Sequence, residues 1–177
     1  MSTWLNSALK RHHRHDQSRL RRAVTRHRPT TRRGAVVGSM FLGAATGLRG
    51  QLGVATVVAR SAPSLPAIFR RPWTRRLVVA AAAGELVVDK LPATPSRLVP
   101  AGTVGRLAMG GLAAGLFAQT RHASWVPAAA VGASSAAVAA KVGHDVRARL
   151  AHHAPDPAVA VVEDALALGL ATAGTSR

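Results

Sequence analysis

The stretch that decides the fold is GAVVGSMFLGAATGLRGQLGVATVVA, residues 34–59. A helix needs about 20 consecutive apolar residues to cross a bilayer, so this run is long enough to do so. Arg49 interrupts it, between Gly47 and Gly50. Because a charged side chain inside hydrocarbon is costly, the run predicts either a buried and paired Arg49 or a break in the helix at this position.

Glycines four residues apart recur in this stretch and later in the chain. This GxxxG spacing lets two helix backbones approach closely, because no Cβ separates them. The glycines predicted to pack helices in this way are Gly34 with Gly38, Gly43 with Gly47, and Gly111 with Gly115. The composition agrees, since 48% of residues are hydrophobic but only 3% are aromatic, whereas the core of a soluble protein usually relies on aromatic rings.

Four further apolar segments follow, at residues 77–91, 103–120, 124–142 and 158–173. Proline- and arginine-rich stretches separate them as loops, including 60–76 and 143–157. The sequence therefore predicts an all-α, polytopic membrane bundle of about five short helices rich in glycine and alanine. The second and fifth segments offer roughly 22 Å of helix against a hydrocarbon core of about 30 Å. Short or interrupted segments in opposite halves are typical of inverted repeats with broken or re-entrant helices.

The N-terminal residues 1–33 form a strongly basic tail. They hold ten of the 24 lysines and arginines, and Asp16 is their only acidic residue, in a chain of net charge +17. Such a segment cannot build a core, so we expect a disordered tail or a short interfacial helix on anionic headgroups. Residues 34–177 are the predicted helical membrane domain. The positive-inside rule then places the N-terminus in the cytoplasm, at the inner or plasma membrane.

Two membrane topologies fit the distribution of charge. If all five segments cross, 16 lysines and arginines lie on the side of the tail and seven lie on the other side. If instead the first segment is a re-entrant hairpin broken near Arg49, 17 lie on the side of the tail and six on the other side. Both topologies keep the tail in the cytoplasm. As a further alternative, Thr31-Arg32-Arg33 resembles a twin-arginine export signal. The glycine-rich, apolar character of the segments beyond residue 60 argues against an exported soluble protein.

Carboxylates in two of the apolar segments are the main functional signal. Glu85 and Asp89 are four residues apart and share a helix face, whereas Glu163 and Asp164 point about 100° apart. Arg49 and Arg106 are the candidate partners. The predicted polar or ion site comprises Arg49, Glu85, Asp89, Lys90, Arg97, Arg106, Glu163 and Asp164. The alternative interpretation is an ion-pair network that fixes helix register, or residues at the level of the headgroups.

Known catalytic and cofactor motifs are missing from the sequence. There is no cysteine, and the histidines at 12, 13, 15, 152 and 153 have no established ligand spacing. The chain has no P-loop, no GxGxxG and no metalloprotease motif. We therefore expect no enzymatic activity, no cofactor and no metal site.

A family resemblance rests on GELVVDKLP at residues 84–92, TPSRL at 94–98 and GR at 105–106. These stretches resemble the bacterial membrane family catalogued as domain of unknown function 4126, and TGLR at 46–49, PDP at 155–157 and VEDA at 162–165 match it further. The resemblance covers roughly residues 35–173, and the basic tail departs from it. It implies a multi-helix membrane protein and singles out Arg49, Glu85, Asp89, Lys90, Arg97, Glu163 and Asp164. It implies no substrate or reaction.

Three hypotheses about function follow from these patterns. The first is a small permease-like or ion-coupled transporter with an acidic and arginine-containing polar site. The second is a structural or scaffold membrane protein whose glycine faces bind partner helices and whose tail binds lipid. The third is a soluble protein that binds nucleic acid through the tail, but no reading helix or aromatic stacking surface accompanies it. The expected partners are the bilayer and anionic headgroups, with a homo-oligomer left open.

Overall fold

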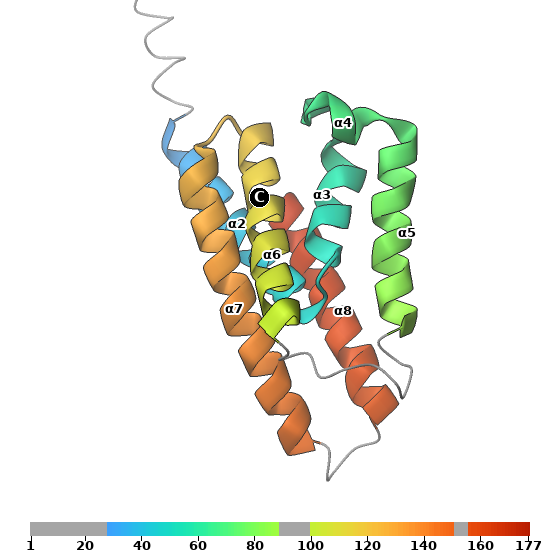
Figure 1. The fold of residues 1–177 in the computed structure, drawn as a ribbon. Coiled ribbons are helices and arrows are strands. Elements are labelled where there is room, and N and C mark those ends of the chain that lie inside the picture. Colours follow the sequence, from blue (N-terminus) through green and yellow to red (C-terminus); the bar gives the residue numbers. More distant parts are fainter. Residues whose placement is uncertain (1–27, 89–99, 151–155) are drawn as a thin grey trace, which may run out of the picture. The chain divides into compact units, whose positions relative to one another are not determined.

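The computed structural model describes residues 28–88, 100–150 and 156–177, which are almost entirely helical (Figure 1). The helices are α2 Arg28–Leu48, α3 Leu52–Ser61, α4 Ala67–Arg70, α5 Pro72–Val88, α6 Pro100–Thr120, α7 Trp125–Leu150 and α8 Asp156–Thr175, with a 3-10 turn, η1, at Ala62–Ser64. No strand occurs within these residues, which confirms the all-α prediction. The described residues hold seven α-helices rather than five, because the first segment is divided and the predicted loop at 60–76 is itself largely helical.

Contacts divide the chain into residues 1–33 and 34–177, and the second unit is described by itself below. Residues 1–27, with most of the basic tail, lie outside the described residues. Helix α2 begins at Arg28 and therefore includes the last residues of the segment 1–33. Pro29 suits this position, because proline has no N–H to offer and the first turn of a helix needs none.

The segment at residues 34–59 is a helical hairpin whose tip is residues 49–51. Helices α2 and α3 run in opposite directions from this tip (Figure 1). Gly53 of α3 lies so close to Thr46 of α2 that a Cβ at residue 53 would overlap the threonine hydroxyl. The helix thus breaks at Arg49, one of the two outcomes that the sequence allowed.

The open end of the hairpin lies at the C-terminal end of α8. Gly38 of α2 packs against the backbone of Gly174. Arg60, in the last turn of α3, donates hydrogen bonds to the carbonyl oxygen of Thr172 at 3.3 Å and to the hydroxyl of Thr175 at 3.1 Å. The open ends of both helices of the hairpin therefore lie beside the same end of α8.

Small residues bring α2, α6 and α7 into backbone contact. A Cβ at Gly43 of α2 would overlap the carbonyl of Gly132 in α7, and one at Gly47 would overlap that of Ala136. Gly110 of α6 faces Gly132 in the same way. Of the other predicted packing glycines, Gly38 faces Phe117 and Gly174, Gly115 faces Trp125, Gly111 faces Ala129 and Gly34 faces Arg177. These glycines thus contact other residues of the same chain.

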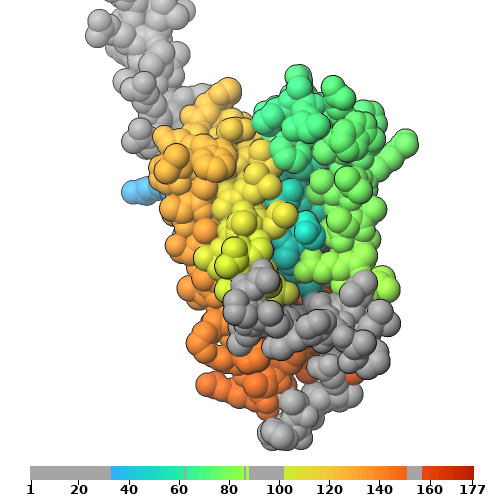
Figure 2. Space-filling model, viewed as in Figure 1, coloured from blue at the N-terminus to red at the C-terminus, as the bar shows by residue number. Residues whose placement is uncertain are grey.

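The apolar core lies between α2, α3 and α6. Leu42, Val57, Val58 and Phe117 are almost completely buried there. In the space-filling view α3 is visible only between α5 and α6, which cover it (Figure 2). The core fixes α3 against its neighbours and thereby fixes the position of the hairpin tip.

Helix α7 is longer than the sequence interpretation allowed. The segment was predicted to end at 142, with a polar loop at 143–157, but α7 continues to Leu150. Apolar residues at every fourth position, Val138, Val142, Val146 and Leu150, continue one face of the helix past the predicted end. Lys141 and Asp145, with Nζ and Oδ2 2.9 Å apart, add an i,i+4 ion pair across the same point.

Within the part of the chain that the structure describes, two helices are long and apolar enough to cross a membrane, Trp125–Leu150 and Pro157–Thr175. Only 17% and 22% of their apolar windows are buried, whereas the core helix of a soluble protein would be mostly buried. Large apolar side chains face outward instead, such as Val126 at 72% and Val162 at 60% exposure. These two helices support the prediction that the chain associates with a membrane. The predicted bundle of five spans is not confirmed, because the other helices described do not meet the same criterion.

Candidate functional site

Arg49 lies at the tip of the hairpin and is the largest fully buried side chain described, with 1% of its surface exposed. Its backbone N–H donates to the carbonyl oxygen of Ala45 at 2.8 Å, which closes the last turn of α2. The N–H of Leu52 donates to the carbonyl oxygen of Arg49 at 3.0 Å and starts the return of the chain into α3. The break therefore places a guanidinium inside the protein, where it requires ionic partners.

Those partners come from α8. Arg49 Nη2 lies 3.5 Å from Glu163 Oε2, and Arg49 Nε contacts the carboxylate of Asp164. Nη2 also donates to the carbonyl oxygen of Ala160 at 3.3 Å. Glu163 and Asp164 are 11% and 20% exposed, so both carboxylates are largely removed from solvent. Glu163 and Asp164 point in different directions around α8, but both reach Arg49 because its guanidinium lies between the two side chains.

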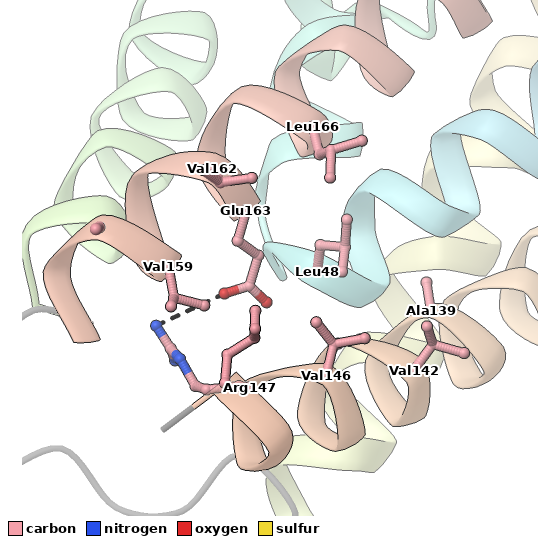
Figure 3. A pocket seen from close by; sticks show the side chains of 12 residues that line it. Leu48, Ala139, Val142, Val146, Arg147, Val159, Val162, Glu163 and Leu166 are labelled. Atoms are coloured by element: carbon pink, nitrogen blue, oxygen red, sulfur yellow. Dashed lines mark ion pairs between the residues drawn. The ribbon is translucent and has the colours of Figure 1, made fainter. Parts of the chain in front are cut away.

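A second arginine reaches the same carboxylate. Arg147 Nη2, from the last turns of α7, lies 3.7 Å from Glu163 Oε2 (Figure 3). One oxygen of Glu163 is therefore shared between the hairpin tip and α7. The sequence interpretation missed Arg147 because it assigned residues 143–157 to a loop. The four-residue apolar spacing that continues to Leu150 is the signal that would have placed it on a helix.

Glu85 of α5 approaches the tip from another side. Its Oε1 accepts a hydrogen bond from the N–H of Gly50 at 2.7 Å, and its Oε2 accepts one from the N–H of Gln51 at 2.8 Å. These amides precede α3, so the carboxylate caps the positive end of that helix. Glu85 had been expected to pair with Arg49 or Arg106, and these two bonds instead join it to the backbone beside Arg49.

Replacing Glu85 by glutamine is expected to loosen the tip of the hairpin. The amide cannot accept two hydrogen bonds in the same geometry and carries no charge to match the helix end, so we expect a loss of about 1–2 kcal/mol. Amide hydrogen exchange at residues 50–53, followed by mass spectrometry, should become about tenfold faster. Asp145→Asn, at an exposed carboxylate of α7, is the matched control. Unchanged exchange in Glu85→Gln would contradict the capping role.

The structure brings together four of the predicted site residues, either directly or through the neighbouring backbone: Arg49, Glu85, Glu163 and Asp164. Arg106 lies half-buried in α6. Asp89, Lys90 and Arg97 lie outside the described residues. Among the residues that the structure does describe, no group of histidine, aspartate and glutamate side chains is arranged to hold a metal ion.

We call the following residues the Arg49 cluster: Arg49, Glu85, Arg147, Glu163 and Asp164. Its carboxylates are held in surroundings of low dielectric constant. Such groups can exchange one cationic partner for another. Glu163 is best placed for this exchange, since two guanidinium groups already share its oxygen. No family model matches the chain, and no curated protein or solved structure was found to match it.

Proposed function

We propose that the chain is a small integral membrane protein of the permease type, in which the Arg49 cluster binds and releases a proton or a small cation. The observation that carries this proposal is the break of a glycine-rich apolar segment at a buried arginine, which pairs with Glu163 and Asp164 of a second apolar helix. Ionisable residues inside a membrane segment are costly and mark ion pathways more often than ordinary packing.

The helical hairpin is the architectural support for transport. Interrupted helices in transporters place broken backbone and helix ends around a site within the membrane, where protein groups satisfy the free amides. Here Glu85 satisfies the amides of Gly50 and Gln51, and α8 supplies the carboxylates for Arg49. The tip lies level with Gly143 of α7, beside Leu48, so roughly 10 Å of α7 continues beyond it. The polar cluster would therefore lie within the bilayer if α7 crosses it.

The proposed topology is the re-entrant one. With both ends of the hairpin beside the end of α8, the tail, the segment 60–76 and the C-terminus would share the cytoplasmic side, which then holds 17 lysines and arginines against six. Resistance to carbonate extraction tests the membrane part of this proposal. A chain released by carbonate without detergent would contradict it.

Transport is tested with the proton as the probe. The purified full chain is reconstituted into liposomes that contain a pH-sensitive dye, and a potassium diffusion potential is imposed with valinomycin. We expect proton flux above that of empty liposomes. In Glu163→Gln the flux should fall at least tenfold, because a glutamine side chain cannot take up and release a proton as a carboxylate does. Asp145→Asn, outside the cluster, is expected to retain the flux. Equal flux in Glu163→Gln and the unmodified chain would refute the proposed site.

A scaffold protein is the second candidate, because a purely structural network would form the same closed ion pairs as the Arg49 cluster. Its partner surface would differ from the one first expected. Gly43 and Gly111 face α7, so the partner would bind instead to an exposed apolar face such as that of α5, where Leu77 is 61% and Val87 is 65% exposed. Absence of flux, together with a stoichiometric partner lost in Leu77→Asn, would favour this candidate.

We also propose that the chain belongs to the bacterial membrane family that its sequence resembles. The motif residues Arg49, Glu163 and Asp164 are in contact in the structure, so two separate stretches of that resemblance, TGLR and VEDA, contribute to one site. A sequence alignment in which the tip arginine and the late Glu-Asp pair are exchanged or lost together would support this, and independent loss of either would oppose it.

A further inference from the structure

An apolar pocket opens between α7 and α8, beside the Arg49 cluster (Figure 3). Its volume is about 420 Å³, and its walls are almost entirely aliphatic. Val142 and Val146 line it from α7, Val162 and Leu166 line it from α8, and Leu48 of the hairpin lies at its inner end. The two helices are held apart here, and the Arg147–Glu163 ion pair spans the space between them.

The pocket continues onto an exposed apolar stripe. Val138, Val142 and Val146 repeat every four residues along α7 and are 64%, 53% and 44% exposed. An aliphatic cavity open to an aliphatic surface offers no hydrogen-bonding groups to a polar solute. It suits a flexible hydrocarbon chain that enters from the side, as a lipid would enter from the bilayer.

One end of the pocket is basic. Arg147 lines it, and Arg149 lies in the same last turn of α7. Arginine is suited to phosphate, because its planar guanidinium donates two parallel hydrogen bonds. An anionic headgroup at this end would place its acyl chain along the aliphatic walls toward Leu48.

The aliphatic walls favour a hydrocarbon chain as the occupant. A single acyl chain is thin and conforms to an irregular space, so it can fill a pocket of this size. Charge complementarity then selects among lipids in favour of an anionic headgroup.

We infer that the pocket between α7 and α8 binds one acyl chain of an anionic phospholipid, with the phosphate at the end that Arg147 lines. The inference rests on the membrane location in the proposed function, but not on transport. It assigns to the chain a lipid site distinct from the one predicted at the basic tail, because this site lies within residues 34–177.

The test uses the full chain purified in detergent and titrated with phosphatidylglycerol or phosphatidylcholine, with bound lipid counted by native mass spectrometry. We expect one phosphatidylglycerol to bind at least tenfold more tightly than phosphatidylcholine. Val146→Trp and Leu150→Trp, which fill the pocket from inside and from its outer end, should each weaken this binding at least tenfold. Val138→Trp, on the same helix face but outside the pocket, is the matched control and should bind as the unmodified chain does. Arg149→Gln should cost about fivefold, the effect of one basic residue near a phosphate.

Several results would overturn the inference. Equal binding of the two lipids would mean that no anionic site exists, and equal loss in Val146→Trp and Val138→Trp would remove the pocket from the explanation. A dimer that dissociates in Val146→Trp would identify a second copy of the chain as the occupant. Thermal unfolding of each variant separates a filled pocket from a misfolded chain. Failure of proton flux with intact lipid binding would refute transport alone.

Discussion

Arg49→Ala is expected to lower the free energy of unfolding by about 3–5 kcal/mol, the loss typical of removing one member of a buried ion pair. The guanidinium is 1% exposed and joins the hairpin tip to Glu163 and Asp164 of α8. Without it, two largely buried carboxylates lose their shared partner, and the space of a large side chain is left open. Denaturant titration of the purified chain in detergent, followed by circular dichroism, measures the change.

Two further variants show whether charge pairing is the cause. Arg60→Ala removes an exposed arginine that also donates to α8, at Thr172 and Thr175, and should cost less than about 1 kcal/mol. Combining Arg49→Met with Glu163→Gln and Asp164→Asn removes all three charges while keeping most of the volume, so it should restore at least half of the lost stability. An Arg49→Ala variant as stable as Arg60→Ala would show that the pairs contribute little.

Gly43→Ala is expected to destabilise the chain by about 3 kcal/mol, the upper end of the cost of overpacking a core. The added Cβ would overlap the carbonyl and Cα of Gly132, so backbone meets backbone and no flexible side chain can move aside. Helices α2 and α7 would have to separate, which would move the hairpin tip away from α8. Denaturant titration gives the stability, and hydrogen exchange at residues 49–51 reports the tip.

Glycines elsewhere in the chain provide the comparison. A Cβ at Gly169 of α8 or at Gly105 of α6 would meet nothing within 4 Å. Alanine at either position should stabilise the helix by about 0.5–1 kcal/mol, because it has less backbone freedom to lose on folding. If Gly43→Ala behaved like Gly169→Ala, the close contact between α2 and α7 would be wrong.

The sequence was most informative where chemistry and local pattern coincide. An arginine between glycines in an apolar run predicted a break or a buried pair, and the structure has both at Arg49. The late Glu163-Asp164 pair was selected because carboxylates are costly in an apolar helix, and it lies against that arginine. In contrast, the end of α7 was misplaced, because charged residues after 142 were taken as a loop although the four-residue apolar spacing continued.

Partners distant in sequence required the tertiary structure. Arg49 and Glu163 are more than a hundred residues apart, and no local rule of helix or turn relates them. Glu85 was expected to pair with an arginine, yet its hydrogen bonds go to two backbone amides, which carry no sequence signal. The glycine spacing predicted close helix packing but not which helix would be the partner, since any small surface can accept it.

The sequence by itself determined that the described chain is helical and that its apolar segments pack through small residues. It also indicated that the few carboxylates in those segments need partners. These properties follow from local propensity and from the cost of burying charge, which act over a few neighbouring residues. Only the tertiary structure decided that the first segment turns back on itself, that α2 packs on α7 through Gly43 and Gly132, and that α8 supplies the carboxylates for Arg49. These contacts depend on the packing of several helices at once, because a buried guanidinium is stable only where all of its partners are in place.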